Sequence, residues 1–276
     1  MLGLGTGVNR GGFVGGSAPA ARLLDTFSGA AAAYSLRLLS NSYSGNAVKV
    51  RRASDNAELD IGFSSGELDT SALTTHCGSS DGFVVTWYDQ ASSNNATQST
   101  TANQPKIYDG TTGVVTENGK PAVEFDGSND FVATSDFTAE AQPFYFSLVT
   151  APDSTSLSRF IDTNGTVTND RINITLNGSQ YEMNAGNSIT GGTTTTTQQL
   201  LTADFDTTSS FLYKDGAQII SGDVGTRNID AVRIGANKNG IQVINGTIQE
   251  VLFYSSDQSA KRTGIETNIN TFYSIY

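Results

Sequence analysis

Short runs of β-branched and aromatic residues, separated by turn-forming Gly, Asn, Asp and Ser, recur along most of the 276-residue chain. Runs of this length indicate β-strands joined by tight turns. With strands on this spacing, an antiparallel β-sandwich of two sheets buries the apolar faces best. We predict strands at 47–51, 58–63, 83–88, 122–125, 144–149, 159–162, 171–176, 200–205, 211–214, 217–220, 232–234 and 247–254.

Two segments have a helical pattern instead. Residues 26–40 contain a four-alanine run, preceded by a serine that can cap a helix. Near the other end, residues 257–273 carry one apolar stripe, made of Ile265, Ile269 and Phe272. We therefore predict a mainly β fold with one N-terminal and one C-terminal helix.

The glycine-rich start of the chain sets it apart from the rest. Residues 1–24 hold few large apolar side chains, so we expect an arm that forms no core of its own, followed by a single sandwich over 25–276. The N-terminus has no basic and apolar pattern of a signal peptide, and no run approaches the roughly 20 apolar residues of a membrane helix. We expect synthesis in a cytoplasm and no membrane partner.

Charge and cysteine content exclude several classes of function. The formal net charge is −11 with only 16 Lys and Arg, so the chain lacks the basic surface that binds nucleic acid. Cys77 is the single cysteine, which excludes an internal disulfide and a site with several thiolate ligands.

One aromatic and polar cluster is a candidate glycan-binding site. Trp87, Tyr88, Asp89 and Gln90 follow a run of β-formers and combine stacking surfaces with hydrogen-bonding groups. The alternative is that the aromatic pair packs in the core, as such pairs at the end of an apolar strand usually do.

An oxygen-rich turn offers a candidate cation site. Asp126, Asn129 and Asp130 supply the carboxylate and amide oxygens that Ca²⁺ prefers. The alternative is that these side chains satisfy backbone groups of a turn. We favour the turn, and predict no cofactor.

Several motifs resemble known families. The segments 125–131, 203–216 and 246–254 resemble the FDG-x-x-D-aromatic turn, central strand pair and closing strand of concanavalin A-like (laminin-G-type) lectin domains. That resemblance implies a jelly-roll sandwich. In the first half, Tyr34-Ser35-Leu36-Arg37, residues 47–55 and Thr86-Trp87-Tyr88-Asp89-Gln90 resemble the catalytic domain of the α-L-arabinofuranosidase B family, which has the same sandwich fold.

The second resemblance bears on catalysis. It implies a nucleophilic Glu on a mid-domain strand, near Asp204 and Asp206 of this chain, where no Glu occurs. An aspartate is one methylene shorter and would misplace the attacking oxygen. Asp204 and Asp206 are therefore weak catalytic candidates, and Asp206 suits a turn. We predict a protein that is not an enzyme.

A third resemblance gives the predicted function. The opening Met1-Leu2-Gly3-Leu4-Gly5 and its glycine-rich continuation are similar to the start of bacteriophage structural proteins with lectin-like modules. We predict a homo-oligomeric virion protein, a capsid decoration or tail component, whose arm docks on other virion proteins and whose sandwich binds host surface glycan. The alternatives are a glycoside hydrolase of arabinofuranosidase type and a stand-alone carbohydrate-binding module.

Overall fold

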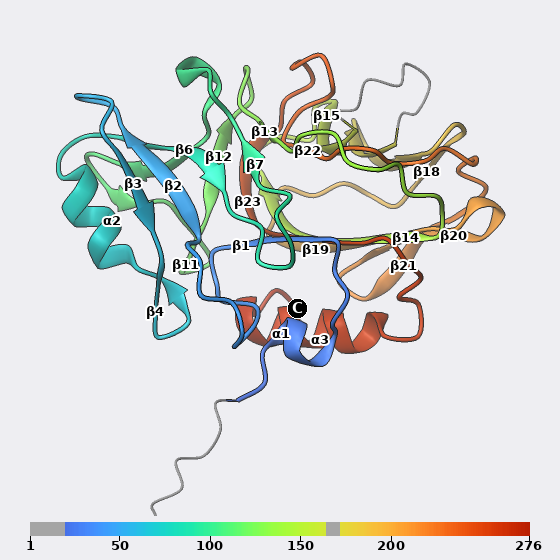
Figure 1. Ribbon diagram of the computed structural model, residues 1–276. Helices are drawn as coiled ribbons and strands as arrows, with labels where there is room; N and C mark the ends of the chain where they lie inside the picture. Colours follow the sequence, from blue (N-terminus) through green and yellow to red (C-terminus); the bar gives the residue numbers. More distant parts are fainter. Residues whose placement is uncertain (1–19, 164–171) are drawn as a thin grey trace, which may run out of the picture.

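The computed structural model describes residues 20–163 and 172–276, and these residues form a mainly β, antiparallel sandwich (Figure 1). In its first layer, neighbouring strands are hydrogen-bonded side by side. At one end of the layer, β1 pairs with the C-terminal half of β23 and β12 pairs with its N-terminal half. In order, the strands of this layer are β21 (Ala217–Gly222), β20 (Ser210–Lys214), β19 (Gln199–Phe205), β14 (Phe144–Pro152), β23 (Asn245–Tyr254), and then β1 (Ala32–Ser35) and β12 (Val123–Asp126).

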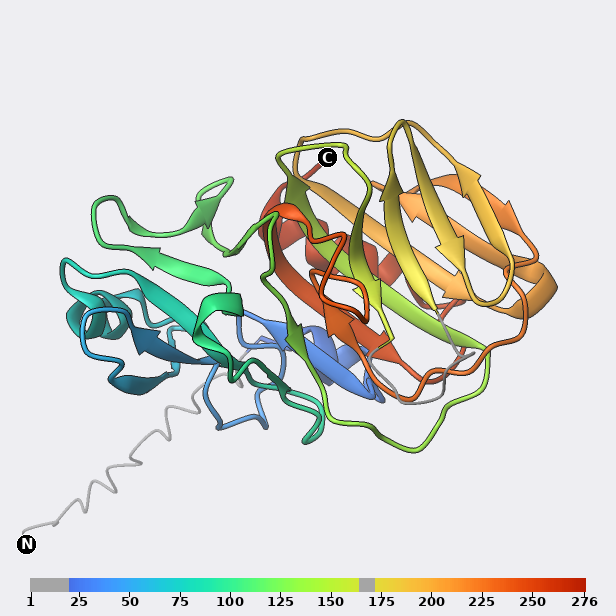
Figure 2. The ribbon, with the colours of Figure 1, turned by 90° about the horizontal axis from the view of Figure 1, so that it is seen from above.

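The pairing continues from β12 into the rest of the molecule. One branch runs through β8 (Lys106–Asp109), β6 (Gly82–Trp87), β2 (Val48–Arg52) and β3 (Glu58–Ile61). The other leaves β6 through β7 (Ala96–Thr97), β13 (Val132–Ala133), β22 (Arg233–Ile234), β15 (Ser158–Asp162), β16 (Asn173–Asn177), β17 (Gln180–Asn184) and β18 (Ser188–Gly191). Because β18 packs back against β21, the sheet is nearly closed like a barrel. Figure 2 shows most strands of the first half gathered on one side, and those from β14 onward on the other.

Three helices and several short elements complete the fold. The helices are α1 (Leu23–Thr26), α2 (Thr70–Cys77) and α3 (Arg262–Tyr273). The short elements are β4 (Phe63–Ser64), β5 (Glu67–Leu68), η1 (Thr101–Asn103), β9 (Gly113–Val114), β10 (Thr116–Glu117), β11 (Lys120–Pro121) and η2 (Thr207–Ser209). None of the helices within the described ranges is long and apolar enough to cross a membrane.

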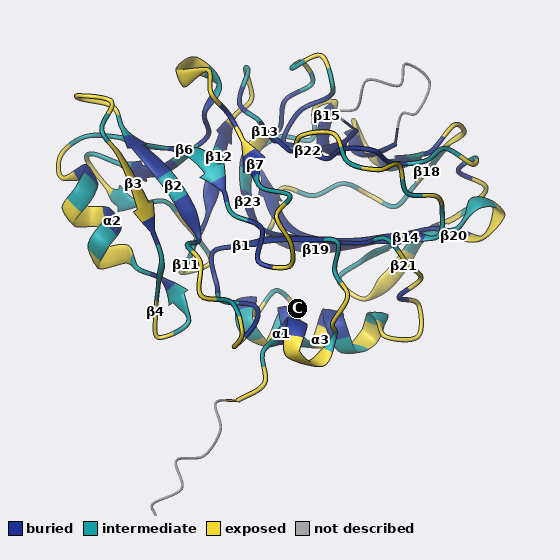
Figure 3. Ribbon diagram, in the orientation of Figure 1, coloured by how far each residue is buried: buried dark blue, intermediate teal, exposed yellow. Residues whose placement is uncertain are grey.

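The central strands are buried on both faces, as Figure 3 shows for β14 and β19. Alternate residues such as Phe146 and Phe205 point into the sandwich interior, where their aromatic rings pack together. The opposite face of the same strands carries Tyr145 and Leu200, which pack under α1 and α3 together with Ile265. A strand covered on both faces has a continuous apolar run, which explains the sequence of 144–149.

The predicted strands are confirmed, with shifts of a few residues at their ends, and so is the C-terminal helix in its last three turns. The predicted helix at 26–40 is wrong. The described N-terminal helix α1 is one turn long and ends before the alanine run, and Ala32–Ser35 is strand β1, paired with Phe253 to Glu250 of β23. Sheet pairing and burial between two apolar layers override the modest helix propensity of alanine.

Helix α2 was not predicted, although its start has a recognisable signal. The Asp69 carboxylate accepts a hydrogen bond from the Ala72 backbone N–H at 3.0 Å, the contact of a helix N-cap. Of the predicted glycine-rich arm at 1–24, residues 1–19 lie outside the described part of the chain, as does residue 171 of the predicted strand 171–176.

Candidate functional site

A pocket with several carboxylates lies on the outer face of the sheet where β12, β8 and β6 pair. Alternation along β12 turns Val123 and Phe125 into the core and leaves Glu124 and Asp126 on the other face. The pocket has a volume of about 380 Å³, and η1 contributes to its wall. Its lining residues are Asp81, Phe83, Thr101, Ala102, Gln104, Lys106, Glu124, Asp126 and Asp130.

Asp130 is the most perturbed carboxyl group in this pocket. Only 6% of its surface is exposed, and its Oδ2 accepts the Asp126 backbone N–H at 3.1 Å. Burial raises the pKa of Asp130 to about 7, with further contributions from the negative charges of Asp126 and Glu124. Asp130 is therefore partly protonated at neutral pH and can donate a proton.

The remaining walls are held in place by polar contacts. The Lys106 ammonium lies 3.3 Å from a carboxylate oxygen of both Asp81 and Asp109, so its charge is shared between them. On the other side, Gln104 Oε1 accepts a hydrogen bond from Arg51 Nε at 2.6 Å. The Arg51 guanidinium also lies 5.0 Å from the centroid of the Phe83 ring. Both contacts fix side chains that line the pocket.

This arrangement combines groups that suit carbohydrate chemistry. Phe83 is half-buried and supplies an apolar surface, while the half-buried Lys106 supplies hydrogen-bond donors and the carboxylates supply acceptors. Two carboxyl groups in one pocket can serve as acid and base or nucleophile of a glycosidase. Glu124 and Asp130 are two of the four carboxyl groups that line this pocket, and Asp130 has the raised pKa.

The two predicted catalytic aspartates lie elsewhere. Asp204 is in β19, on the face that packs under α3, and burial, Asp257 and Asp206 raise its pKa to about 6. Asp206 follows β19, where its backbone N–H donates to Ser210 Oγ at 2.9 Å. This position is the turn between β19 and β20, so the structure places neither residue in the acidic pocket. Both stay predictions.

The predicted glycan-binding residues are largely committed to the fold. Trp87 is fully buried against Tyr34. Asp89 accepts the backbone N–H groups of residues 33, 91 and 94, and Gln90 bonds the backbone at residues 35, 37 and 39. Tyr88 is half-buried and donates its hydroxyl to Asp60 at 2.7 Å. Of the two aromatic rings, that of Tyr88 is the more accessible, and the glycan-binding role stays a prediction.

The oxygen-rich turn is occupied by backbone groups. Asp126 Oδ1 accepts the N–H groups of Ser128 and Asn129, at 2.8 and 3.3 Å, while Asp130 accepts from Asp126. Within residues 20–163 and 172–276, no group of three or more His, Cys, Asp or Glu side chains is arranged to hold a metal ion. These contacts are those of the turn alternative for the side chains of Asp126 and Asp130, while Asn129 takes part through its backbone N–H, and the cation site stays a prediction.

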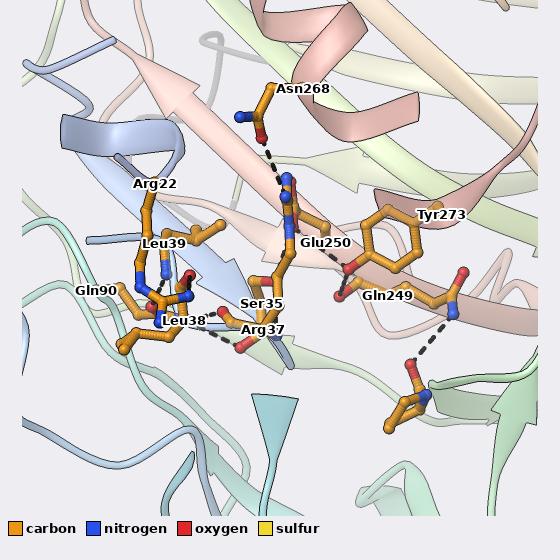
Figure 4. Close-up of polar contacts among 11 residues, drawn as sticks. Arg22, Ser35, Arg37, Leu38, Leu39, Gln90, Gln249, Glu250, Asn268 and Tyr273 are labelled. Carbon is orange, nitrogen blue, oxygen red and sulfur yellow. Dashed lines mark hydrogen bonds and ion pairs between the residues drawn. The ribbon is translucent and has the colours of Figure 1, made fainter. Parts of the chain in front are cut away.

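A buried ion pair anchors β1 to β23 away from the acidic pocket. Arg37 Nε and Nη2 donate to the two carboxylate oxygens of Glu250 at 2.7 and 2.9 Å, and Ser35 Oγ donates to the same carboxylate at 2.8 Å (Figure 4). Asn268 and Tyr273 of α3 complete the network. The charges of Arg37 and Glu250 are both satisfied within the protein, which gives Glu250 a structural role.

Comparisons with known proteins agree on an arabinofuranosidase-like fold. Residues 26–133 match the family model "Alpha-L-arabinofuranosidase B, catalytic". Among solved structures, a GH54 α-L-arabinofuranosidase with a cyclic sulfate inhibitor has a TM-score of 0.73, 16% identity and coverage of 90% of this chain and 64% of its own. A glutamate-to-glutamine mutant of a GH54 α-L-arabinofuranosidase, soaked with 4-nitrophenyl α-L-arabinofuranoside, has a TM-score of 0.71 with the same identity and coverage.

A third structure is an arabinofuranosidase complexed with arabinofuranosyl-α-1,2-xylobiose. Its TM-score is 0.69 at 18% identity, and the match covers 87% of this chain and 62% of that one. The chain thus spans less than two thirds of the length of these neighbours. A search of curated proteins finds no match.

These findings overturn the predicted function. The matched family model describes a catalytic domain, and the similar structures are glycosidases, so the predictions of a virion protein and of a protein that is not an enzyme are wrong. The short glycine-rich opening that suggested a virion lies in residues 1–19, outside the described structure. What the comparisons establish for this chain is the sandwich fold that it shares with arabinofuranosidases.

Proposed function

We propose that this protein is a glycoside hydrolase that acts on α-L-arabinofuranosides, with the acidic pocket on β12 as its active site. The observation that carries the proposal is Asp130, a nearly buried carboxyl group with a pKa of about 7 beside Glu124 and Asp126. The substrate class comes from the family model and from the ligands of the similar structures.

Asp130 has the properties of the general acid. Its raised pKa keeps a proton available near neutral pH, and that proton would pass to the glycosidic oxygen as the bond to the sugar breaks.

Glu124 is the better second carboxylate. Asp126 Oδ1 already accepts two backbone N–H groups, which hold it in the turn, whereas Glu124 projects from the middle of β12 into the pocket. There Glu124 would attack the anomeric carbon or activate a water for that attack.

Hydrolysis of methyl α-L-arabinofuranoside tests this assignment, because its methoxide leaving group needs a proton from the general acid. We expect Asp130→Asn and Glu124→Gln each to lower kcat/KM at least about 100-fold. Asp130→Asn removes the general acid, and Glu124→Gln removes the carboxylate that acts as base or nucleophile. Asp136→Asn is the matched control, since Asp136 is exposed and does not line the pocket, and we expect its activity to stay within about twofold of wild type.

Two results would contradict the proposal. The first is a wild-type protein that releases no arabinose from the methyl glycoside. The second is a Glu124→Gln or Asp130→Asn variant as active as Asp136→Asn, which would place the chemistry elsewhere in the molecule.

A further inference from the structure

We propose that a second pocket, next to the acidic one, binds the sugar on the far side of the scissile bond, so that the protein prefers oligosaccharides over simple glycosides. This inference rests on the proposed function. The second pocket also has a volume of about 380 Å³, and the two share Asp126 in their walls. A substrate with its scissile bond near Asp130 can therefore extend past Asp126 into the second pocket.

Gly127 directly follows the shared residue Asp126 and lines the second pocket. Its φ of +75° is a conformation that side chains rarely adopt, and a Cβ there would lie 2.9 Å from Asn245 Cβ. Gly127 and Asn245 both line the second pocket, so a side chain at Gly127 would crowd it beside Asp126. The glycine therefore leaves this part of the second pocket open.

The walls of the second pocket come from three loops that are tied together. The Gly127 N–H donates to the Ile244 carbonyl at 3.0 Å, which joins the β12–β13 loop to the β22–β23 loop. The Asp153 and Arg159 N–H groups donate to the carbonyls of Asn245 and Gln242, at 2.7 and 2.8 Å, which joins the β14–β15 loop to the same segment. These backbone hydrogen bonds hold the three walls of the pocket in a fixed arrangement, which lowers the cost of ordering them around a ligand.

The side chains of this pocket suit a neutral sugar. Leu157 and Ile241 are 45% and 57% exposed, unusually high for large apolar residues, and both line it. They offer apolar surface to the C–H face of a sugar ring. Hydroxyl groups surround them, and of the described residues that line the pocket only Asp126 is charged; the hydroxyls belong to Ser128, Ser154, Ser156 and Ser158. A phosphate or an acidic ligand would meet no basic side chain among these residues.

The test compares two substrates whose leaving groups are alcohols of different size. Methyl α-L-arabinofuranoside releases methanol, and arabinofuranosyl-xylobiose releases xylobiose. We expect the double variant Leu157→Ala/Ile241→Ala to lower the ratio of their kcat/KM values, oligosaccharide over methyl glycoside, about tenfold. Leu59→Ala is the matched control, because Leu59 is a 43% exposed leucine on β3 and does not line the pocket. We expect it to leave the ratio unchanged.

If the double variant is active and its ratio is unchanged, the proposal that the second pocket binds the far sugar is wrong, and the proposed function stands. If wild type hydrolyses neither substrate, the proposed function fails. Calorimetric titration with arabinofuranosyl-xylobiose then tests whether the second pocket binds the oligosaccharide. Affinity at least about tenfold weaker in the double variant than in wild type and Leu59→Ala would support the pocket as a binding site. Absence of binding to wild type, or equal affinity in all three proteins, would overturn it.

Discussion

Asp130 accepts a hydrogen bond from the backbone N–H of Asp126 at 3.1 Å, while burial and the negative charge of the Asp126 carboxylate raise the pKa of Asp130. The hydrogen bond favours the ionised form of Asp130, but burial and the neighbouring charge outweigh it. The fold thus holds a carboxyl group where its ionised form is unfavourable, a feature that often marks a functional site.

The raised pKa of Asp130 predicts that the stability of the protein depends on pH. The pKa of Asp130 in the folded state is about 7, above the ordinary value of 3.8, so its stabilising contribution is full below pH 3.8 and is lost as the pH rises through 7. Asp130→Asn removes the ionisation, so the variant should exceed wild type in free energy of unfolding at pH 8 by roughly 2 kcal/mol, about half of the ~4 kcal/mol that the full shift implies, because solvent screens part of the charge. The two proteins should differ little at pH 4.

Urea denaturation at the two pH values measures this difference, with Asp136→Asn as the control. A wild-type protein as stable as Asp130→Asn at pH 8 would show that Asp130 ionises without cost. The combination of higher stability at pH 8 with lost hydrolysis would identify Asp130 as a residue retained for activity.

The buried ion pair predicts a large and specific loss of stability. Glu250→Gln leaves the Arg37 guanidinium buried without its countercharge, and we expect it to lower the free energy of unfolding by about 3–5 kcal/mol. Asp55→Asn breaks the exposed pair with Arg52 and should leave the stability nearly unchanged. Equal effects of the two substitutions in denaturant titrations would contradict the structural role of Glu250.

Two glycines with positive φ should differ in their tolerance of a methyl group. A Cβ at Gly246 would lie 2.3 Å from the backbone carbonyl oxygen of Ala151, whereas one at Gly119 meets no atom within 4 Å. Gly119→Ala should therefore cost only the backbone term of roughly 1–2 kcal/mol. Gly246→Ala should cost clearly more, because β23 must shift away from β14. Similar melting temperatures for the two variants would argue against the close approach of these strands.

The sequence predicted the sandwich well because its strands carry local signals. Alternation marks β2 and β12, and a continuous apolar run marks β14, whose two faces are both covered. The helix prediction over 26–40 failed because the alanines of β1 have no local signal for a strand. Their conformation depends on pairing with β23, more than 200 residues away in sequence.

The candidate site could be predicted only in part. Asp126 and Asp130 stood out as polar residues in a turn, but their partners Glu124, Lys106 and Phe83 come from three strands that only the sheet register brings together. The perturbed pKa of Asp130 depends on burial in the folded protein, which the sequence around it does not reveal. By contrast, the residues near Trp87 drew attention because they are adjacent in sequence.

The pH dependence of kcat/KM for methyl α-L-arabinofuranoside, whose leaving group must be protonated, tests the central claim most directly. If Asp130 is the general acid, wild-type activity should fall about tenfold per pH unit above a pKa near 7, as the proton is lost. Asp130→Asn should be at least about 100-fold less active and lack that decline. Wild-type protein without hydrolysis at any pH, or an Asp130→Asn variant that keeps both the activity and the decline above pH 7, would contradict the account.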